Sequence, residues 1–123
     1  IIFNSKKKKK KNNNKNRLCS IVHSLDVLRM LKCEFEVFGK VQGVSFRKYT
    51  FLKANELNVF GWCKNTPSGT VIGELEGDED SVIKMIDFLE REGSPGSTIE
   101  KCVVSNRRTV EEHAFNSFRI RCD

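Results

Sequence analysis

The order in which hydrophobic periodicities follow one another limits this chain to few folds. The segment "CEFEVFG" (33–39) alternates apolar and polar residues with the period of two that is typical of a half-buried strand. The segment "SFRKYTFLKANEL" (45–57) then places apolar residues at helical spacing. Strand-like runs follow at 59–65 and 71–77, a second helical run at 78–93, and further strand-like runs at 99–108 and 115–122. The predicted order is therefore β-α-β-β-α-β with an extra strand.

This order predicts the architecture. Each helix lies between two strands, so both helices should cover one face of a largely antiparallel sheet. Right-handed crossover connections leave few alternatives to a split βαβ arrangement. The predicted fold class is α+β, a ferredoxin-like α/β sandwich with two helices on one face of a mostly antiparallel five-stranded sheet. Such a fold serves RNA binders, metal carriers and small enzymes alike, so it does not by itself name a function.

Residues at the ends of the predicted helices support these boundaries. Ser45 is a candidate N-cap of the first helix, and Asn58, which tolerates the left-handed conformation, should close it. Acidic residues at 78–80 suit the positive end of the second helix dipole, and Gly93 should end that helix. The apolar stripe of the second helix comprises Val82, Met85, Ile86 and Leu89.

The formal net charge of +6 comes from one end of the chain. Residues 1–17 contain eight of the 22 Lys and Arg residues and none of the 16 Asp and Glu residues, so the remainder is close to neutral. The low-complexity run "NSKKKKKKNNNKNR" (4–17) should be disordered, and it serves either as a tag for nuclear targeting or an anionic surface, or has no selected role. No nucleic-acid partner is expected for the folded part.

Three regions are predicted along the chain: a disordered Lys/Asn-rich tail over 1–17, a lead-in over 18–32, and one folded domain over 33–122. Helical spacing of leucines and Val22 in the lead-in leaves a short helix or an irregular connection open. No signal peptide is apparent, and no apolar run approaches the ~20 residues that cross a bilayer, so no membrane partner is expected.

The cysteines predict a reducing compartment. There are five of them, no C-x-x-C motif, and two histidines, a composition that argues against a zinc site. We therefore expect free thiols, a cytoplasmic protein and no metal. Cys33, Cys63 and Cys122 fall in strand-like runs and are predicted to be buried. The aromatic residues Phe60, Trp62 and Phe118 are assigned to the core.

The loop "GKVQGVSFR" (39–47) contains the chemistry-bearing pattern of this chain. A glycine-containing loop before a helix N-terminus directs several backbone N–H groups at one point, where the helix dipole adds positive potential. Arg47, in the first helical turn, offers a planar fork that matches phosphate oxygens. The predicted phosphate-binding loop consists of Gly39, Lys40, Val41, Gln42, Gly43, Val44, Ser45 and Phe46. Lys40 and Lys48 either attract anionic substrates or are solvated.

Over residues 33–122 the sequence resembles the acylphosphatase family. The resemblance is carried by V-Q-G-V-x-F-R (41–47), by G-W-x-x-N followed by G-T-V (61–71), by "GSPGS" (93–97), and by a closing F-x-I-R (118–121). It implies that Arg47 binds the phosphate, that Asn65 orients the attacking water, and that residues 39–46 cradle the phosphate.

Three positions depart from the family pattern. Asn58 stands where the family usually has glycine, Glu76 replaces a common glutamine, and Cys63 replaces a usual valine. None of them alters Arg47 or Asn65, so the departures concern stability and the rim of the site.

The implied reaction is hydrolysis of the carboxyl–phosphate bond of an acyl phosphate by direct attack of water. The leaving carboxylate comes from an acid with a pKa of about 4.3, so it departs without being protonated. A loose phosphoryl transition state needs positioning and charge stabilisation, which an asparagine and an amide cradle with one arginine supply. The predicted partners are an acyl phosphate substrate and inorganic phosphate as product and inhibitor. We expect a metal-independent monomer without cofactors.

Two alternatives remain open. One is a non-catalytic acylphosphatase-like module that binds phosphate or another anion, tethered to anionic partners by residues 6–17. The other is a cysteine-dependent phosphatase, because "CVVSNRRT" (102–109) has the Cys-x5-Arg-Thr spacing of such enzymes. That segment contains no glycine and has the pattern of a strand, which would not bend around a phosphate.

Overall fold

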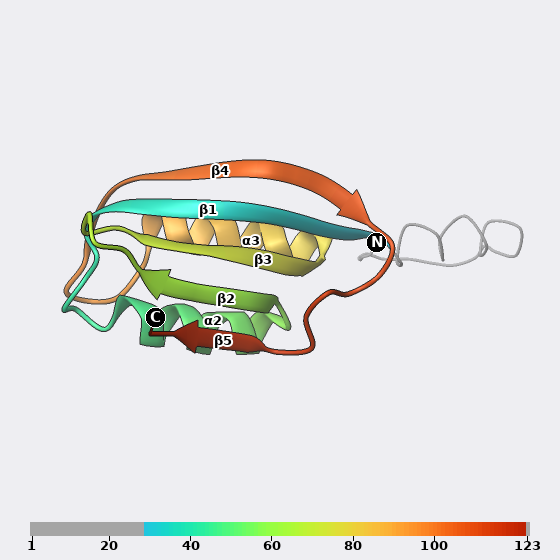
Figure 1. Cartoon of the computed structure of the whole chain (residues 1–123), viewed down its shortest axis with the longest axis horizontal. Coiled ribbons are helices and arrows are strands. Elements are labelled where there is room, and N and C mark those ends of the chain that lie inside the picture. The colour runs from blue at the N-terminus through green and yellow to red at the C-terminus, as the bar shows by residue number, and fades with distance from the viewer. Residues whose placement is uncertain (1–28, 123) are drawn as a thin grey trace, which may run out of the picture.

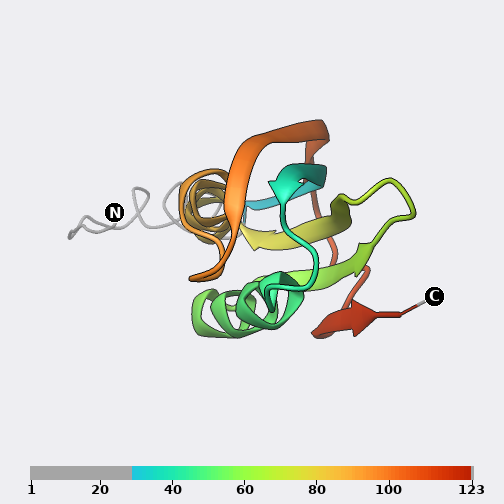
Figure 2. The same cartoon turned by 90° about the vertical axis from the view of Figure 1, so that its left-hand side faces the viewer.

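The structure is a computed structural model in which residues 29–122 are described, and it consists of one layer of strands and one layer of helices (Figure 1). The elements are β1 (Met30–Lys40), α2 (Phe46–Leu57), β2 (Phe60–Asn65), β3 (Val71–Asp78), α3 (Glu79–Arg91), β4 (Thr98–Val110) and β5 (Phe118–Arg121). Both helices cover the same face of the sheet, as the end-on view in Figure 2 shows. The ferredoxin-like prediction is confirmed.

The five strands form one mixed sheet in the order β4-β1-β3-β2-β5. β1 lies between β4 and β3 and is antiparallel to both, while β2 and β3 form an antiparallel hairpin. β5 is the extra strand, and it pairs in parallel with β2 at the edge, with Trp62 opposite Arg119. The sheet is therefore mostly antiparallel, with one parallel pair.

The buried faces of the strands and the apolar stripes of the helices pack together in one apolar core. In β1 the side chains of Cys33, Phe35 and Val37 are buried beneath the helices, whereas Glu34 on the opposite face is exposed. The helices contribute buried side chains from one stripe each, namely Phe46, Thr50 and Ala54 from α2 and Val82, Met85, Ile86, Phe88 and Leu89 from α3. Removal of this apolar surface from water is the main force that holds the two layers together.

Several boundaries differ from the sequence prediction. β1 begins at Met30, three residues before the predicted start, because Met30 and Leu31 are buried and pair with β3 and β4. β4 extends to Val110, and β5 begins only at Phe118, because 111–117 form a connection that crosses the end of the sheet. The tail and residues 18–28 lie outside the described residues.

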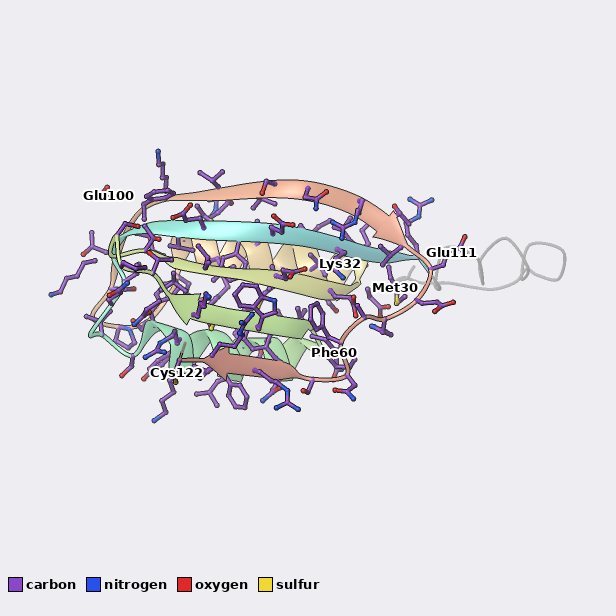
Figure 3. The ribbon with its side chains drawn as sticks, in the orientation of Figure 1. Met30, Lys32, Phe60, Glu100, Glu111 and Cys122 are labelled. Atoms are coloured by element: carbon purple, nitrogen blue, oxygen red, sulfur yellow. The ribbon has the colours of Figure 1, made fainter. Side chains whose placement is uncertain are left out.

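The predicted core is only partly correct. Cys33, Cys63 and Phe118 are buried as expected. The prediction for Cys122 is wrong: this residue directly follows the last residue of β5, where Figure 3 labels it, and it is exposed. Trp62, like Phe60, is half-buried on the sheet face away from the helices, where its indole Nε1 donates to Glu74 at 3.0 Å.

Glu76 holds the connection between β4 and β5 in place. Its side chain is fully buried, although strand alternation places it on the face away from the helices together with Lys32 and Phe60 (Figure 3). The carboxylate accepts from the backbone amides of Ala114 at 2.9 Å and Phe115 at 3.1 Å. Nδ1 of His113 lies 2.9 Å from it and Nζ of Lys32 lies 3.5 Å from it.

These contacts set the protonation of Glu76. Burial alone would raise the pKa of this carboxyl, but the two backbone amides, His113 and Lys32 outweigh burial and lower the pKa below its ordinary value. The carboxylate form therefore binds the connection that delivers β5 to its place beside β2.

Candidate active site

Three segments distant in sequence meet at one end of the sheet. β1 ends there and continues into residues 41–45, β2 ends there in the turn that leads to β3, and β5 ends there as well (Figure 1). Figure 2 looks directly onto this end. The ends of all three segments therefore lie close together.

The loop before α2 has an unusual backbone. Gly43 has φ of 75° and Ser45 has φ of 60°, so two left-handed residues stand within three positions of the helix start. Ser45 occupies the N-cap position, but its side chain makes no capping hydrogen bond; its backbone carbonyl accepts from the amide of Tyr49 at 3.1 Å. The predicted side-chain cap is therefore wrong. Left-handed residues next to a right-handed turn make successive amides converge on one point, which is the geometry of an anion-binding nest.

A hollow of about 380 Å³ opens at this loop. Its lining residues are Val41, Gly43, Ser45, Phe46, Arg47, Lys48, Asn65 and Ile120. Loop, helix start, β2 and β5 all contribute to it, and its ionisable side chains are Arg47 and Lys48. The hollow is thus a basic pocket at the N-terminus of a helix, where the dipole also favours an anion.

Arg47 is held at the edge of this hollow by β5. Its Nη1 donates to the backbone carbonyl of Arg121 at 3.3 Å. That distance is at the long end for an N–H···O bond, so the contact is weak and an anionic oxygen could replace it. Burial raises the pKa of the Cys63 thiol to about 12, and the Arg47 guanidinium lies close enough to oppose that rise.

Asn65 is the last residue of β2, and its carboxamide lines the same hollow. Its Oδ1 is buried and has no hydrogen-bond partner, a situation that within residues 29–122 is shared only with Oγ of Ser94. Buried polar atoms in native proteins nearly always have a partner. An acceptor left unused beside this pocket is suited to a hydrogen-bond donor such as a water molecule.

The turn that follows Asn65 is fixed by its own hydrogen bonds. The amide of Thr66 donates to the carbonyl of Thr70 at 2.9 Å, and the two threonine hydroxyls lie 2.7 Å apart. Oγ1 of Thr70 donates to Glu36 on β1 at 2.7 Å. The side chain of Gln42 joins this turn to the loop, because its Nε2 donates to the carbonyls of Thr66 at 2.8 Å and Thr70 at 2.9 Å.

The predicted loop residues divide into two groups. Val41, Gly43, Ser45 and Phe46 line the hollow together with Arg47 and Asn65. Gly39, Lys40, Gln42 and Val44 are not among the lining residues. Gly39 and Lys40 belong to β1, where Gly39 permits the close approach of β4: a Cβ there would lie 2.2 Å from the carbonyl oxygen of Thr98. Val44 packs against the core.

Two lining residues were not assigned to the site from the sequence. Lys48 follows Arg47 in the first turn of α2, and the sequence left open whether it is solvated or attracts anions. Ile120 lies two residues after the buried Phe118, so strand alternation points it to the same face of β5. That parity was readable in the sequence, whereas the pairing of β5 with β2 was not.

The cysteine-dependent alternative does not fit the structure. Cys102 lies within β4, paired with Val37 of β1, so the segment that follows it is strand and not a phosphate loop. Burial raises the pKa of its thiol to about 12, and Glu90 adds to the rise. A thiol of that pKa is a poor nucleophile at neutral pH because the reactive form is the thiolate.

Residues 29–122 contain no cluster of three or more His, Cys, Asp or Glu side chains that could hold a metal ion. In the same part of the chain, none of the helices has the length and apolar character needed to cross a bilayer.

The chain matches the family model described as Acylphosphatase over residues 33–120. It is 46% identical over 88 residues to acylphosphatase-2 of Bos taurus and to acylphosphatase-2 of Homo sapiens, which covers 72% of this chain and 89% of each relative. Among solved structures it is similar to an acylphosphatase from Coxiella burnetii, with a TM-score of 0.66 and 32% identity, covering 76% of this chain and 94% of that one.

Proposed function

The chain belongs to the acylphosphatase family, and from this premise we propose that it hydrolyses acyl phosphates in the hollow at the start of α2. The products are a carboxylate and inorganic phosphate. One observation carries the assignment to this hollow: an arginine, a loop with two left-handed residues and a buried, partnerless asparagine oxygen converge on one basic pocket.

Binding of the phosphate is assigned to the loop and Arg47. The backbone N–H groups of the loop around Gly43 and Ser45 donate hydrogen bonds to the peripheral phosphoryl oxygens, and the positive end of the helix dipole lies behind them. Arg47 exchanges its weak bond to the Arg121 carbonyl for a bond to a phosphoryl oxygen, which is charged and therefore a stronger acceptor. In the loose transition state these donors stabilise the charge on the peripheral oxygens.

Positioning of the water is assigned to Asn65. Its partnerless Oδ1 can accept a hydrogen bond from water, and its amide group can donate one. A water held in line with the phosphorus attacks, the phosphorus–oxygen bond to the acyl group breaks, and the carboxylate leaves with the electron pair. A proton of the attacking water passes to a phosphoryl oxygen or to solvent. The leaving group has a low enough pKa, about 4.3, to depart unprotonated, so the scheme requires neither a general acid nor a metal.

A hydrolysis assay with benzoyl phosphate in EDTA tests this proposal. The wild-type protein should hydrolyse benzoyl phosphate under these conditions. Arg47→Gln should lose activity by about 10³-fold or more together with phosphate affinity, since an arginine on a transferring phosphoryl group is worth 10³–10⁵ in rate. Asn65→Ala should lose activity by roughly 10²–10³-fold, the usual cost of one preorganised group, while phosphate still binds in a calorimetric titration.

The outcomes separate the alternatives. Activity that survives both substitutions contradicts the site assignment. Phosphate binding without any turnover in wild type supports the non-catalytic module instead.

We further propose a monomeric cytoplasmic protein. Cys33, Cys63, Cys102 and Cys122 are free thiols, which is typical of proteins in reducing compartments. The division into a tail over 1–17, a lead-in over 18–32 and a domain over 33–122 stays a proposal too, as does a nuclear signal in the tail.

A further inference from the structure

The two halves of the proposed site come from different elements. The phosphate loop connects β1 to α2, whereas Asn65 ends β2 and is followed by the turn over residues 66–70. Residues 41–45 belong to no strand, so sheet pairing does not fix the distance between the loop and Asn65. Core packing of the buried Val41 and Phe46 anchors the loop, and a contact between the loop and the turn adds to this.

The side chain of Gln42 makes that contact. Its Nε2 carries two protons, and both are donated: one to the carbonyl of Thr66 at 2.8 Å, the other to the carbonyl of Thr70 at 2.9 Å. Thr66 is the residue directly after Asn65. One primary amide therefore binds both ends of the turn that directly follows Asn65.

The turn is held together by hydrogen bonds of its own. Besides the bonds between Thr66 and Thr70, the amide of Gly69 donates to the carbonyl of Thr66 at 3.2 Å. The hydroxyl of Thr70 is tied to Glu36 of β1. A shift of the turn relative to the phosphate loop would therefore carry Asn65 with it, because the turn has little internal freedom.

We propose that the Gln42 side chain is the positioning residue that sets the carboxamide of Asn65 relative to the phosphate cradle. It does so without contacting substrate, since its amide protons are bound to the turn and it is not among the residues that line the hollow. This inference rests on the proposed function. It assigns to Gln42 a role in the step that uses water and none in holding the phosphate.

That division predicts a split between rate and binding. A reacting group misplaced by about 1 Å costs on the order of 10²-fold in rate. Loss of the Gln42 bonds should therefore lower kcat by roughly 10–100-fold. Affinity for inorganic phosphate, measured as competitive inhibition or by calorimetry, should change by less than about threefold, because the loop amides and Arg47 remain.

The experiment uses Gln42→Ala and Gln42→Glu in the full chain, with Asn65→Ala as reference. A second comparison places Gln42→Ala in the Asn65→Ala background. If Gln42 acts through Asn65, adding Gln42→Ala to the Asn65→Ala variant should lower kcat by less than about threefold, since the effects of residues that act as a unit are strongly non-additive.

Gln42→Glu adds a pH signature. The ionised carboxylate has no proton to donate and faces two carbonyl oxygens, so the variant should be at least as impaired as Gln42→Ala at pH 7.5. A protonated carboxyl regains one donor. The activity of Gln42→Glu relative to wild type at the same pH should therefore rise by about threefold or more when the pH is lowered from 7.5 to 5. The relative activity of Gln42→Ala should not change over this range.

Val104→Ala is the control for general destabilisation. Val104 is half-buried on β4 and packs against the core away from the hollow, so its truncation lowers stability and leaves kcat unchanged. The proposal is overturned if kcat of Gln42→Ala stays within twofold of wild type or if phosphate affinity falls in parallel with kcat. It is also overturned if Gln42→Ala lowers kcat equally in the wild-type and Asn65→Ala backgrounds.

A readout independent of turnover separates failure of this inference from failure of the proposed function. The side-chain amide resonances of Asn65 should shift in Gln42→Ala and stay in place in Val104→Ala. If wild type does not hydrolyse acyl phosphates, the proposed function fails, and this spectrum still decides whether Gln42 positions Asn65. Unshifted resonances in Gln42→Ala overturn the inference.

Discussion

Replacing Glu76 by glutamine removes one charge from a fully buried group and leaves its shape intact. The carboxylate has hydrogen bonds with Ala114, Phe115 and His113, and Lys32 lies 3.5 Å away. A hydrogen bond to a charged group contributes about 1.5–3 kcal/mol and a neutral one about 0.5–1.5 kcal/mol, so each retained bond weakens by roughly 1 kcal/mol. With Lys32 also left without its counter-charge, the expected loss is about 2–4 kcal/mol at pH 7.

The loss should depend on pH in a defined direction. The pKa of Glu76 is lower in the folded protein than in the unfolded chain, so on acidification the unfolded chain takes up the proton first. The stability contributed by the carboxylate is complete above its unfolded pKa, about 4.3, and is lost as the pH falls through the lower folded pKa. The glutamine variant lacks this titration, so wild type and variant should converge as the pH falls below 4.

Urea denaturation at pH 7 and pH 3, followed by the fluorescence of the single tryptophan, Trp62, measures both quantities. Glu34→Gln is the matched control, since Glu34 is exposed on the neighbouring strand and accepts one hydrogen bond from Asn106. Its free energy of unfolding should stay within about 0.5 kcal/mol of wild type. The reasoning is refuted if Glu76→Gln also stays within that range at pH 7, or if its deficit is the same at both pH values.

Three further predictions follow from the backbone and the cysteines. Iodoacetamide at pH 7 should label the exposed Cys122 quickly and leave activity intact, whereas Cys102, whose pKa is raised to about 12, should react slowly. Mass spectrometry identifies the labelled cysteine, and a loss of activity that follows the labelling of Cys102 would contradict the account. Asn58→Gly should stabilise by about 0.5–1 kcal/mol, because Asn58 caps α2 at φ of 59°; a lowered Tm would argue against this. Gly61→Ala should destabilise by more than about 3 kcal/mol, since a Cβ there would lie 2.0 Å from the carbonyl oxygen of Glu74; a normal thermal transition would disprove this contact.

The layers of the fold were predictable from local patterns. Alternation in β1 and the stripes of the two helices report which face of each element is buried, and that information is contained within ten or so neighbouring residues. The position of Arg47 and Asn65 at strand and helix ends followed from the same patterns. What the patterns do not contain is contact between segments far apart in the chain.

Glu76 illustrates this limit. Alternation in β3 assigns it to the solvated face, yet it is fully buried because residues 113–115 fold over it from nearly forty positions away. Gln42 is a second case: its sequence position suggested a backbone amide for phosphate, while its side chain binds a turn 24 and 28 residues further on. The left-handed backbone of Ser45 is a third, since serine before a helix ordinarily predicts a side-chain cap.

The most direct test of the central claim is a crystal structure of the protein with vanadate or phosphate bound. The account predicts the oxyanion in the hollow, within hydrogen-bond distance of the loop amides between Gly43 and Phe46. The guanidinium of Arg47 should have moved from the Arg121 carbonyl to an anion oxygen, and the Asn65 carboxamide should contact the apical oxygen or a water in line with it. An anion bound elsewhere, with the hollow empty at saturating concentration and Arg47 still on Arg121, would contradict it.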